Sequence, residues 1–470
     1  MTTDKEPRPM PLILRLPNEL LMMIFESLSD NGVGQPSATI SSEAIDASPN
    51  KNNAITVVAR TCKRFRELAT TYLSHRVILR RSRDAPVLSS RLRAYPHLAQ
   101  RVRKVVVYEY SDVLAATRPG STLYQVAAEK PYLDEGVKDL WLAMLKSPLS
   151  KGEGVRAWLE VLRDRILDLI ELLLLVPRVE LFRFVGRAIQ HSSYWPPLRV
   201  DVNPFQHALI VAISCLQDAN LSALRSRILP NLRDVHVCGR GSAVWECAMG
   251  TVMRLPKIET LRLDQSAEHG GIYFPVTMGT GASSTLRHLV ITTPSLDLHN
   301  LSAMIRSIGR LDTFHAMYRF PFFPSNTMDE FLASLHRHRG SLSELKLTDE
   351  VPFPFQYSPV RWDGYCSLVT LHVPDYLLFR PCSSVSDVLH VLPPHLISLG
   401  IIPWTLGDPK TTEIVRGLVP SSHRVITLRS IFIHPSPGVR RRSRIRGLSD
   451  RFERRGIVCR YDPDAFVTKS

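Results

Sequence analysis

Two stretches of the chain repeat one pattern: Leu229-Pro230-Asn231-Leu232-Arg233-Asp234-Val235-His236-Val237 and Leu255-Pro256-Lys257-Ile258-Glu259-Thr260-Leu261-Arg262-Leu263. Each opens with a leucine and a proline and continues with apolar residues in the same frame. Further copies begin at Leu286, Leu342, Leu368 and Leu396, and a weaker copy begins at Leu311. Because apolar and polar residues alternate at the end of each copy, the pattern predicts a short β-strand with one buried face.

The spacing of the copies indicates a repeat architecture. Counted from Leu232 to Leu396, their first apolar positions are 26, 28, 25, 31, 26 and 28 residues apart. This spacing resembles that of leucine-rich-repeat proteins, whose repeats have roughly 20 to 29 residues. Helix-like stretches lie between the copies, at 242–254, 298–308, 327–338, 384–392 and 411–419. The sequence therefore predicts an α/β fold, with a degenerate leucine-rich-repeat solenoid of one strand and one helix per repeat.

Before Leu229, the pattern of apolar residues is less regular. Residues 176–184 form one copy and residues 102–107 are a further strand candidate, whereas residues 122–175 have the apolar spacing of helices. We therefore predict an irregular helical N-terminal cap with an early strand over residues 76–175. The solenoid is expected over residues 176–470, ending in a basic helix and a last strand at 456–461.

Strand alternation also predicts which residues face outward. It places Leu261 and Leu263 inward and Arg262 outward. Outward strand residues line the concave face of a solenoid, where such proteins bind partners. The candidate substrate-binding residues on this face are Arg233, Arg262, His288, Lys346 and His372.

The N-terminal region has a different pattern, in which apolar residues cover half of a helix. In residues 16–28 they spread well beyond the roughly 100° stripe that docks one helix face on a core. A second segment, residues 55–72, has one apolar and one basic side. One face of the first helix can pack on that apolar side, but so small a module buries too little surface to stand alone. The remaining apolar face therefore predicts a protein partner.

These residues resemble the F-box family, whose pattern is Leu-Pro-x-Glu-Leu, a hydrophobic pair ending in Ile-Phe, a leucine, and a later helix with Lys-Arg-Phe. The resemblance implies a helical module over residues 11–75 that binds Skp1 and, through it, a cullin-RING ubiquitin ligase. Residues 29–53 are longer than the family's link and polar, so they are expected to form a flexible insert. The residues implied to form the Skp1-binding module are Leu16, Pro17, Leu20, Ile24, Phe25, Leu28, Val58, Cys62 and Phe65.

The composition is that of a folded protein inside the cell. Of 470 residues, 44% are hydrophobic and 22% charged, which is typical of globular chains. The seven cysteines show neither a disulfide framework nor a short metal-ligand spacing. Residues 1–10 are expected to be disordered and lack the apolar core of a signal peptide, and no apolar run is long enough for a membrane span. We therefore expect a cytoplasmic or nuclear protein that is not inserted in a membrane.

The net charge of +15 is concentrated near the end of the chain, where residues 436–460 hold nine arginines and two acidic residues. The cluster Arg440–Arg446 has several interpretations: a solvated helix face, a nuclear-localisation patch, or a site for an acidic partner. Direct nucleic-acid binding is the least favoured, because aromatic residues do not alternate with the arginines as a stacking platform requires.

No pattern in the chain indicates catalysis, a metal or a cofactor. A nucleophile elbow is missing, and the glycines near 279–281 lack the lysine of a phosphate-binding loop. Cys238 and Cys247 do not have a recognised ligand spacing and are interpreted as buried small residues. The resemblance to fungal F-box proteins therefore implies a non-catalytic substrate receptor. The alternative is a basic scaffold that associates with nucleic acid or an acidic partner through Arg440–Arg446.

Overall fold

The structure is a computed structural model, and the statements below concern the residues that it describes. These residues are 16–18, 20–21, 60–80, 84–108, 135–147, 153–185, 211–212, 215, 221–238, 252–253, 255–264, 285–292, 298–318, 325–349, 360–379, 384–402, 428–433, 452–454 and 457–461. The chain divides into two compact units, Met1–Val77 and Ile78–Ser470. Each unit is described by itself.

In the first unit, the longest described helix is α4 (Lys63–Ser74). It carries the Lys-Arg-Phe segment, as the sequence predicts. The buried side chain of Phe65 lies on this helix.

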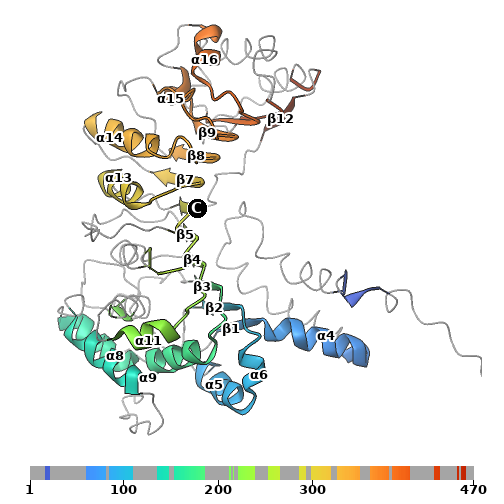
Figure 1. Cartoon of the computed structure of the whole chain (residues 1–470), viewed down its shortest axis with the longest axis vertical. Helices are drawn as coiled ribbons and strands as arrows, with labels where there is room; N and C mark the ends of the chain where they lie inside the picture. Colours follow the sequence, from blue (N-terminus) through green and yellow to red (C-terminus); the bar gives the residue numbers. More distant parts are fainter. Residues whose placement is uncertain are drawn as a thin grey trace, which may run out of the picture. The chain divides into compact units, whose positions relative to one another are not determined.

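Strands β2 to β12 of the second unit form one sheet whose strand order is the chain order (Figure 1). Every neighbouring pair from β2 to β12 is parallel. The strands are β1 (Arg76–Leu79), β2 (Lys104–Tyr108), β3 (Leu181–Val185), β4 (Asp234–Cys238), β5 (Thr260–Asp264), β6 (His288–Thr292), β7 (Thr313–Tyr318), β8 (Glu344–Asp349), β9 (Thr370–Pro374), β10 (Ser398–Ile402), β11 (Ser430–Ile433) and β12 (Val458–Tyr461). The α/β class and the predicted strands are confirmed, and β11 is a strand that the sequence pattern missed.

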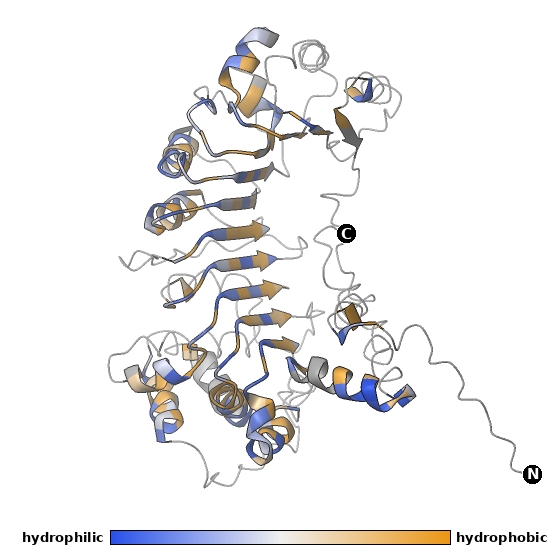
Figure 2. Cartoon of the chain, turned by 45° about the vertical axis from the view of Figure 1, so that its right-hand side comes forward, coloured by the Kyte–Doolittle hydropathy of each residue, from blue (hydrophilic) through white to orange (hydrophobic). Residues whose placement is uncertain are grey.

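The leucine frame is the core of this unit. In β4, Val235 and Val237 face inward, and Leu232, two residues before the strand, is buried with them. The same three positions are buried in the copies at β5, β6, β7, β8, β9 and β10. Figure 2 shows the resulting alternation as bands of hydrophobic and hydrophilic residues along the strands. Strands β4, β5 and β6 therefore bury one face and leave the other partly exposed.

Helices cover the buried face of the sheet. In both views α13 (Leu298–Ser307) and α14 (Ser325–His336) lie on the same side of the strands (Figures 1 and 2). Phe314 of β7 meets Phe331 of α14 with ring centroids 6.1 Å apart, and both rings are fully buried. The other described helices of this unit are α5 (Asp84–Ala94), α6 (Pro96–Ala99), α8 (Glu135–Lys146), α9 (Glu153–Leu175), α11 (Ser222–Arg227), α15 (Asp375–Phe379) and α16 (Val385–Val391).

Four described helices lie in the region predicted as a helical cap, residues 76–175. Helices α8 and α9 lie in the stretch predicted as helical at 122–175, and α5 and α6 lie before it, where no individual helix was predicted. Helix α5 packs on α9, and Arg93 of α5 forms an ion pair with the buried Glu171 of α9. This pairing explains why an acidic residue is tolerated in the most apolar stretch of the chain.

Gly400 sits where two aromatic rings come together. It lies on β10 between His372 of β9 and Phe432 of β11, in one register row. The rings of His372 and Phe432 approach to 5.2 Å between centroids. A Cβ at position 400 would lie 2.8 Å from the Cβ of His372 and would also meet its ring. The missing side chain at Gly400 therefore lets the neighbouring rings meet.

We expect Gly400→Ala to lower the free energy of unfolding by about 1–3 kcal/mol, because the extra methyl group overpacks this row. Urea denaturation of the full chain measures the change. The matched control is Gly340→Ala, where a Cβ would meet nothing within 4 Å, and it should be neutral or slightly stabilising. Adding His372→Ala should recover part of the loss. Equal stabilities of the Gly400→Ala and Gly340→Ala variants would contradict the close approach.

Candidate functional site

The two motif segments of the N-terminal unit are joined by Arg64. Its Nη2 donates to the backbone oxygen of Leu16 and to Oδ1 of Asn18, each at 2.7 Å, and its Nε donates to the same Oδ1 at 3.2 Å. The backbone N–H of Leu21 donates to the oxygen of Pro17, as in a helical turn. The guanidinium group thus holds the start of the first segment against α4, across the long spacer in the sequence.

Burial divides the first segment into an inner and an outer side. Leu21 is 1% exposed, whereas the neighbouring Leu20 is 45% exposed. Phe65 is buried, and Cys62 is half-buried with its sulfur accepting from the Phe65 N–H at 3.4 Å. The predicted contact residues Ile24, Phe25, Leu28 and Val58 and the insert 29–53 lie outside the described residues. Among the described contact residues, Leu20 and Pro17 are exposed, Leu16 and Cys62 are half-buried, and Phe65 is buried.

The outward face of the sheet in the second unit is organised in rows set by strand register. The middle row, called here the central row, is rich in basic residues and histidines. It runs from β3 to β9 through Arg183, His236, Arg262, Val290, His315, Lys346 and His372. Sequence reasoning found three of these residues, but Arg183, His236 and His315 were not among its candidates.

The five predicted substrate residues do not share one row. Arg262 and Lys346 lie in the central row, and His288 lies in the row beside it, in register with Thr260. His372 belongs to the central row but is only 7% exposed, because Phe432 covers it. Two of the five residues, Arg262 and Lys346, are therefore half-buried side chains of the central row, separated by Val290 and His315.

Arg233 occupies a different place from the one expected. It precedes β4, and the residue of β4 in register with Arg262 is His236. Arg233 instead faces Glu259 at 3.7 Å, at the turn into the next strand. Arg233 lies three residues before His236, the position that corresponds to Arg262, because the strand alternation begins only at Asp234. Arg233 therefore is not an outward strand residue.

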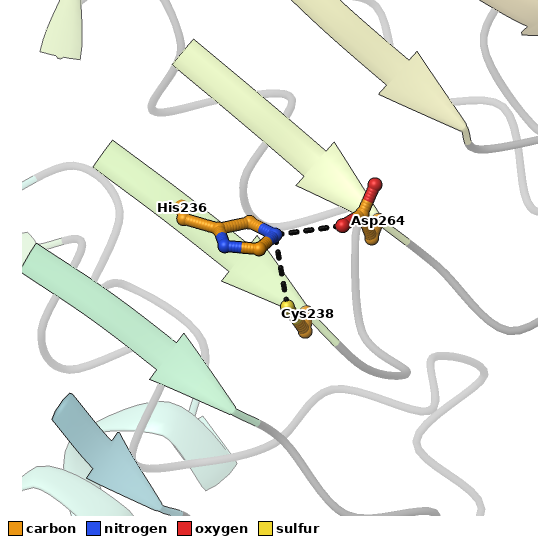
Figure 3. A group of neighbouring side chains, drawn as sticks. All are labelled: His236, Cys238 and Asp264. Carbon is orange, nitrogen blue, oxygen red and sulfur yellow. Dashed lines mark hydrogen bonds and ion pairs between the residues drawn. The ribbon is translucent and has the colours of Figure 1, made fainter. Parts of the chain in front are cut away.

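Three side chains of different chemistry converge on β4 and β5 (Figure 3). His236 and Cys238 are two residues apart on β4 and share its outward face, and Asp264 of β5 is in register with Cys238. The His236 Nε2 atom lies 2.6 Å from Oδ2 of Asp264 and 3.1 Å from Sγ of Cys238. Their three ligand atoms all lie within 4.8 Å of one another. All three side chains are half-buried.

Two arginines and a threonine surround this cluster. Arg262 donates from Nε to Oδ2 of Asp264 at 2.6 Å, and Thr292 of β6 donates to the other carboxylate oxygen at 3.0 Å. Arg183 of β3 donates to Sγ of Cys238 at 3.5 Å. Its Nε is buried and has no hydrogen-bond partner among the described residues. The cluster is therefore a polar centre that spans four neighbouring strands.

The surroundings fix the charges of the cluster. Burial would raise the pKa of Asp264, but hydrogen bonds from His236 and Arg262, with the charge of Arg262, outweigh it and lower the pKa to about 2. Burial lowers the pKa of His236, although Asp264 opposes this effect. Burial raises the pKa of the Cys238 thiol, against the charge of Arg183. At neutral pH the cluster thus holds a carboxylate, a neutral imidazole and a thiol.

This geometry does not suit a nucleophilic cysteine. In such a relay the nucleophile and the acid bind opposite ring nitrogens of the histidine. Here both Cys238 and Asp264 lie at the same nitrogen of His236. A convergence of sulfur, nitrogen and oxygen atoms on one point is instead the geometry of a ligand set. The sequence offered one usable signal, the His-x-Cys spacing on a strand, but the third residue comes from the next repeat.

A second polar group on the outward face lies on β7 and β8. Glu344 is 3.1 Å from Nε2 of His315 and 2.6 Å from Nζ of Lys346. The close approach of His315, and then that of Lys346, lowers the pKa of Glu344 to about 2 in spite of burial. The carboxylate thus neutralises part of the central row.

Two further predicted features, Cys247 and the cluster Arg440–Arg446, lie outside the described residues. Among the described helices, none is both long and apolar enough to cross a bilayer.

No protein-family model matches the chain, and no curated protein matches its sequence.

The Glu344 carboxylate makes the stability of the second unit depend on pH. Its folded pKa of about 2 lies below the ordinary value of 4.5, so its contribution is complete above about pH 5 and disappears as the pH falls towards 2. We expect Glu344→Gln to destabilise the chain by about 1–2 kcal/mol at pH 7, allowing for partial solvent screening. Urea unfolding at several pH values should show this difference shrinking below pH 4.

The control for this titration is Glu135→Gln, on the exposed surface of α8. It removes a carboxylate from a solvent-exposed pair and is expected to change stability by less than about 0.5 kcal/mol. A difference between the wild type and Glu344→Gln that stays constant from pH 7 to pH 2 would refute the assigned role of Glu344.

Proposed function

We propose that the protein is the substrate-recognition subunit of a Skp1–cullin–F-box type ubiquitin ligase and that it catalyses no reaction itself. The N-terminal unit would bind Skp1, and the outward face of the repeat sheet would bind a protein substrate. The observation that carries the proposal is the Leu-Pro-Asn-Glu-Leu segment held against the Lys-Arg-Phe helix, with Leu20 left exposed beside the buried Leu21.

In the N-terminal unit, the proposal is supported by Leu20, an apolar side chain that is exposed and contributes little to the stability of the unit. A leucine that is 45% exposed gains little from the fold of its own unit. Burying it in a partner removes apolar surface from water, at roughly 25 cal/mol per Å². Because Arg64 fixes the turn from Leu16 to Asn18, this side chain is presented without further ordering of the segment.

In the second unit, the proposal is supported by the polar outward face of the sheet. The inward side chains of the strands are buried in the core, so the backbone that carries the outward side chains has a fixed position. Such a face can hold a partner protein, and tethering that partner to a ligase raises the effective concentration of its lysines near the activated ubiquitin. The central row, with Arg262 and Lys346, is the proposed contact surface.

The proposal predicts that Leu20→Asp will weaken Skp1 binding at least tenfold, because the partner would have to bury an unpaired charge. A pull-down of purified full-length chain with purified Skp1 measures the effect. The combination of Leu20→Asp with Phe25→Asp, the second motif position, should abolish retention.

The matched control is Leu142→Asp, which places the same charge on an exposed leucine of α8 in the second unit. This variant should retain Skp1 as the wild type does. The receptor function is wrong if wild-type chain does not retain Skp1, or if both leucine variants bind it equally well.

A further inference from the structure

We propose that His236, Cys238 and Asp264 form a binding site for a zinc-class divalent ion. The site is independent of the ubiquitin-ligase function proposed above. It rests on the convergence of three potential ligand atoms, the Nε2, Sγ and Oδ2 atoms, on one point of the outward face.

The dimensions of the cluster are close to those of a three-ligand zinc site. Zinc takes bonds of about 2.0–2.1 Å to nitrogen, about 2.0–2.2 Å to oxygen and about 2.3 Å to sulfur, in tetrahedral geometry. Tetrahedral angles at these lengths put the ligand atoms roughly 3.3–3.6 Å apart. The observed separations from His236 Nε2 are 2.6 Å to Asp264 and 3.1 Å to Cys238. Side-chain shifts of under about 1 Å therefore open the cluster enough for the ion.

The donor atoms select the class of ion. A thiolate and an imidazole are ligands for zinc and its soft or borderline neighbours, whereas Mg²⁺ and Ca²⁺ take sets made almost entirely of oxygen. Three protein ligands leave the fourth tetrahedral position to a water molecule or to a group from a partner. On binding, the thiol of Cys238 loses its proton to solvent, and any proton on Nε2 of His236 must move to Nδ1.

The backbone brings the ligands together before any ion is present. His236 and Cys238 are on the same face of one strand, and register fixes Asp264 opposite Cys238. Thr292 donates to the Oδ1 atom of Asp264, which orients the carboxylate and leaves its other oxygen towards the cluster. Hydrogen bonds of this kind to a ligand commonly strengthen metal sites.

The two arginines shape the affinity of the site. The charges of a divalent ion, one thiolate and one carboxylate sum to zero, so Arg183 and Arg262 remain as adjacent positive charges. Both repel the ion, yet both also donate hydrogen bonds to its anionic ligands, Arg183 to the sulfur and Arg262 to the carboxylate. We therefore expect a site weaker than a structural zinc site with four protein ligands.

Two measurements on the wild-type chain test the site. Reduced, metal-free full-length protein is titrated with Zn²⁺ against a chromophoric chelator, and one bound ion per chain is expected. The same protein is then alkylated with and without Zn²⁺, and each cysteine is followed by mass spectrometry. Zinc should slow the alkylation of Cys238 at least tenfold and leave that of the exposed Cys366 unchanged.

Variants locate the ligands independently. Cys238→Ser and Asp264→Asn should each weaken Zn²⁺ binding at least about tenfold, whereas Cys366→Ser serves as the matched control and should bind as the wild type does. Binding of Co²⁺ to wild-type chain should give a thiolate charge-transfer absorption that Cys238→Ser removes. Circular dichroism shows whether each variant is folded.

The proposal is overturned if the wild-type chain binds no zinc, or if zinc leaves the alkylation of Cys238 unchanged. It is also overturned if another cysteine is protected in its place. Loss of Skp1 binding in the Leu20 variants has no bearing on these results, so the two proposals fail separately.

Discussion

The second unit depends on one constraint, the in-register pairing of each strand with the next strand along the chain. At each turn into a strand, one carbonyl accepts two N–H groups from the following repeat, as Arg233 does from Glu259 and Thr260. The same arrangement recurs at Glu259, Arg287, Asp312, Ser343, Val369 and Ile397. Buried backbone groups must be paired, so this ladder fixes the register of every repeat. A residue's place in the leucine frame then determines its neighbours.

The turns before the strands show how side chains support this ladder. Six successive positions alternate in charge: Arg103, Glu180, Arg233, Glu259, Arg287 and Asp312. The pairs Arg103–Glu180 and Arg233–Glu259 both approach to 3.7 Å. Each exposed pair contributes little by itself. If a strand paired instead with the strand two repeats away, residues of like charge would face each other at these turns. The alternation of charge therefore favours the observed pairing.

The same register also determines the chemistry of the outward face. In the central row, the charged residues Arg183, Arg262 and Lys346 do not lie on adjacent strands, because histidines and Val290 lie between them. Carboxylates from the flanking rows contact this row. Asp264 lies against His236 and Arg262, and Glu344 lies against His315 and Lys346. The outward face therefore carries ion pairs rather than a continuous positive groove. Non-specific binding to nucleic acid depends on such unpaired positive charge, so this face is better suited to a specific contact with a protein.

The sequence predicted what lies within one repeat and missed what lies between repeats. Leucines at fixed spacing located β4 to β10, because burial of one strand face is a local pattern. Strand β11, whose frame begins at Leu428, was missed because its apolar residues Ile431, Phe432 and Ile433 are continuous and do not alternate with polar residues. The contact of His236 with Asp264 joins residues from two repeats, and it can be found only once the register is known.

The N-terminal unit poses the opposite problem, since its two segments are separated by a long spacer instead of a repeat. Residues 29–53 separate the two segments in the sequence. The entropy cost of joining two segments grows slowly with the length of the connection, by about 0.6 kcal/mol for each doubling. A hydrogen bond to a charged group contributes about 1.5–3 kcal/mol. The three hydrogen bonds of Arg64 to Leu16 and Asn18 are therefore sufficient to offset the spacer. The long spacer is then compatible with a defined arrangement of the two segments, because loop entropy grows slowly and one well-placed guanidinium group counteracts it.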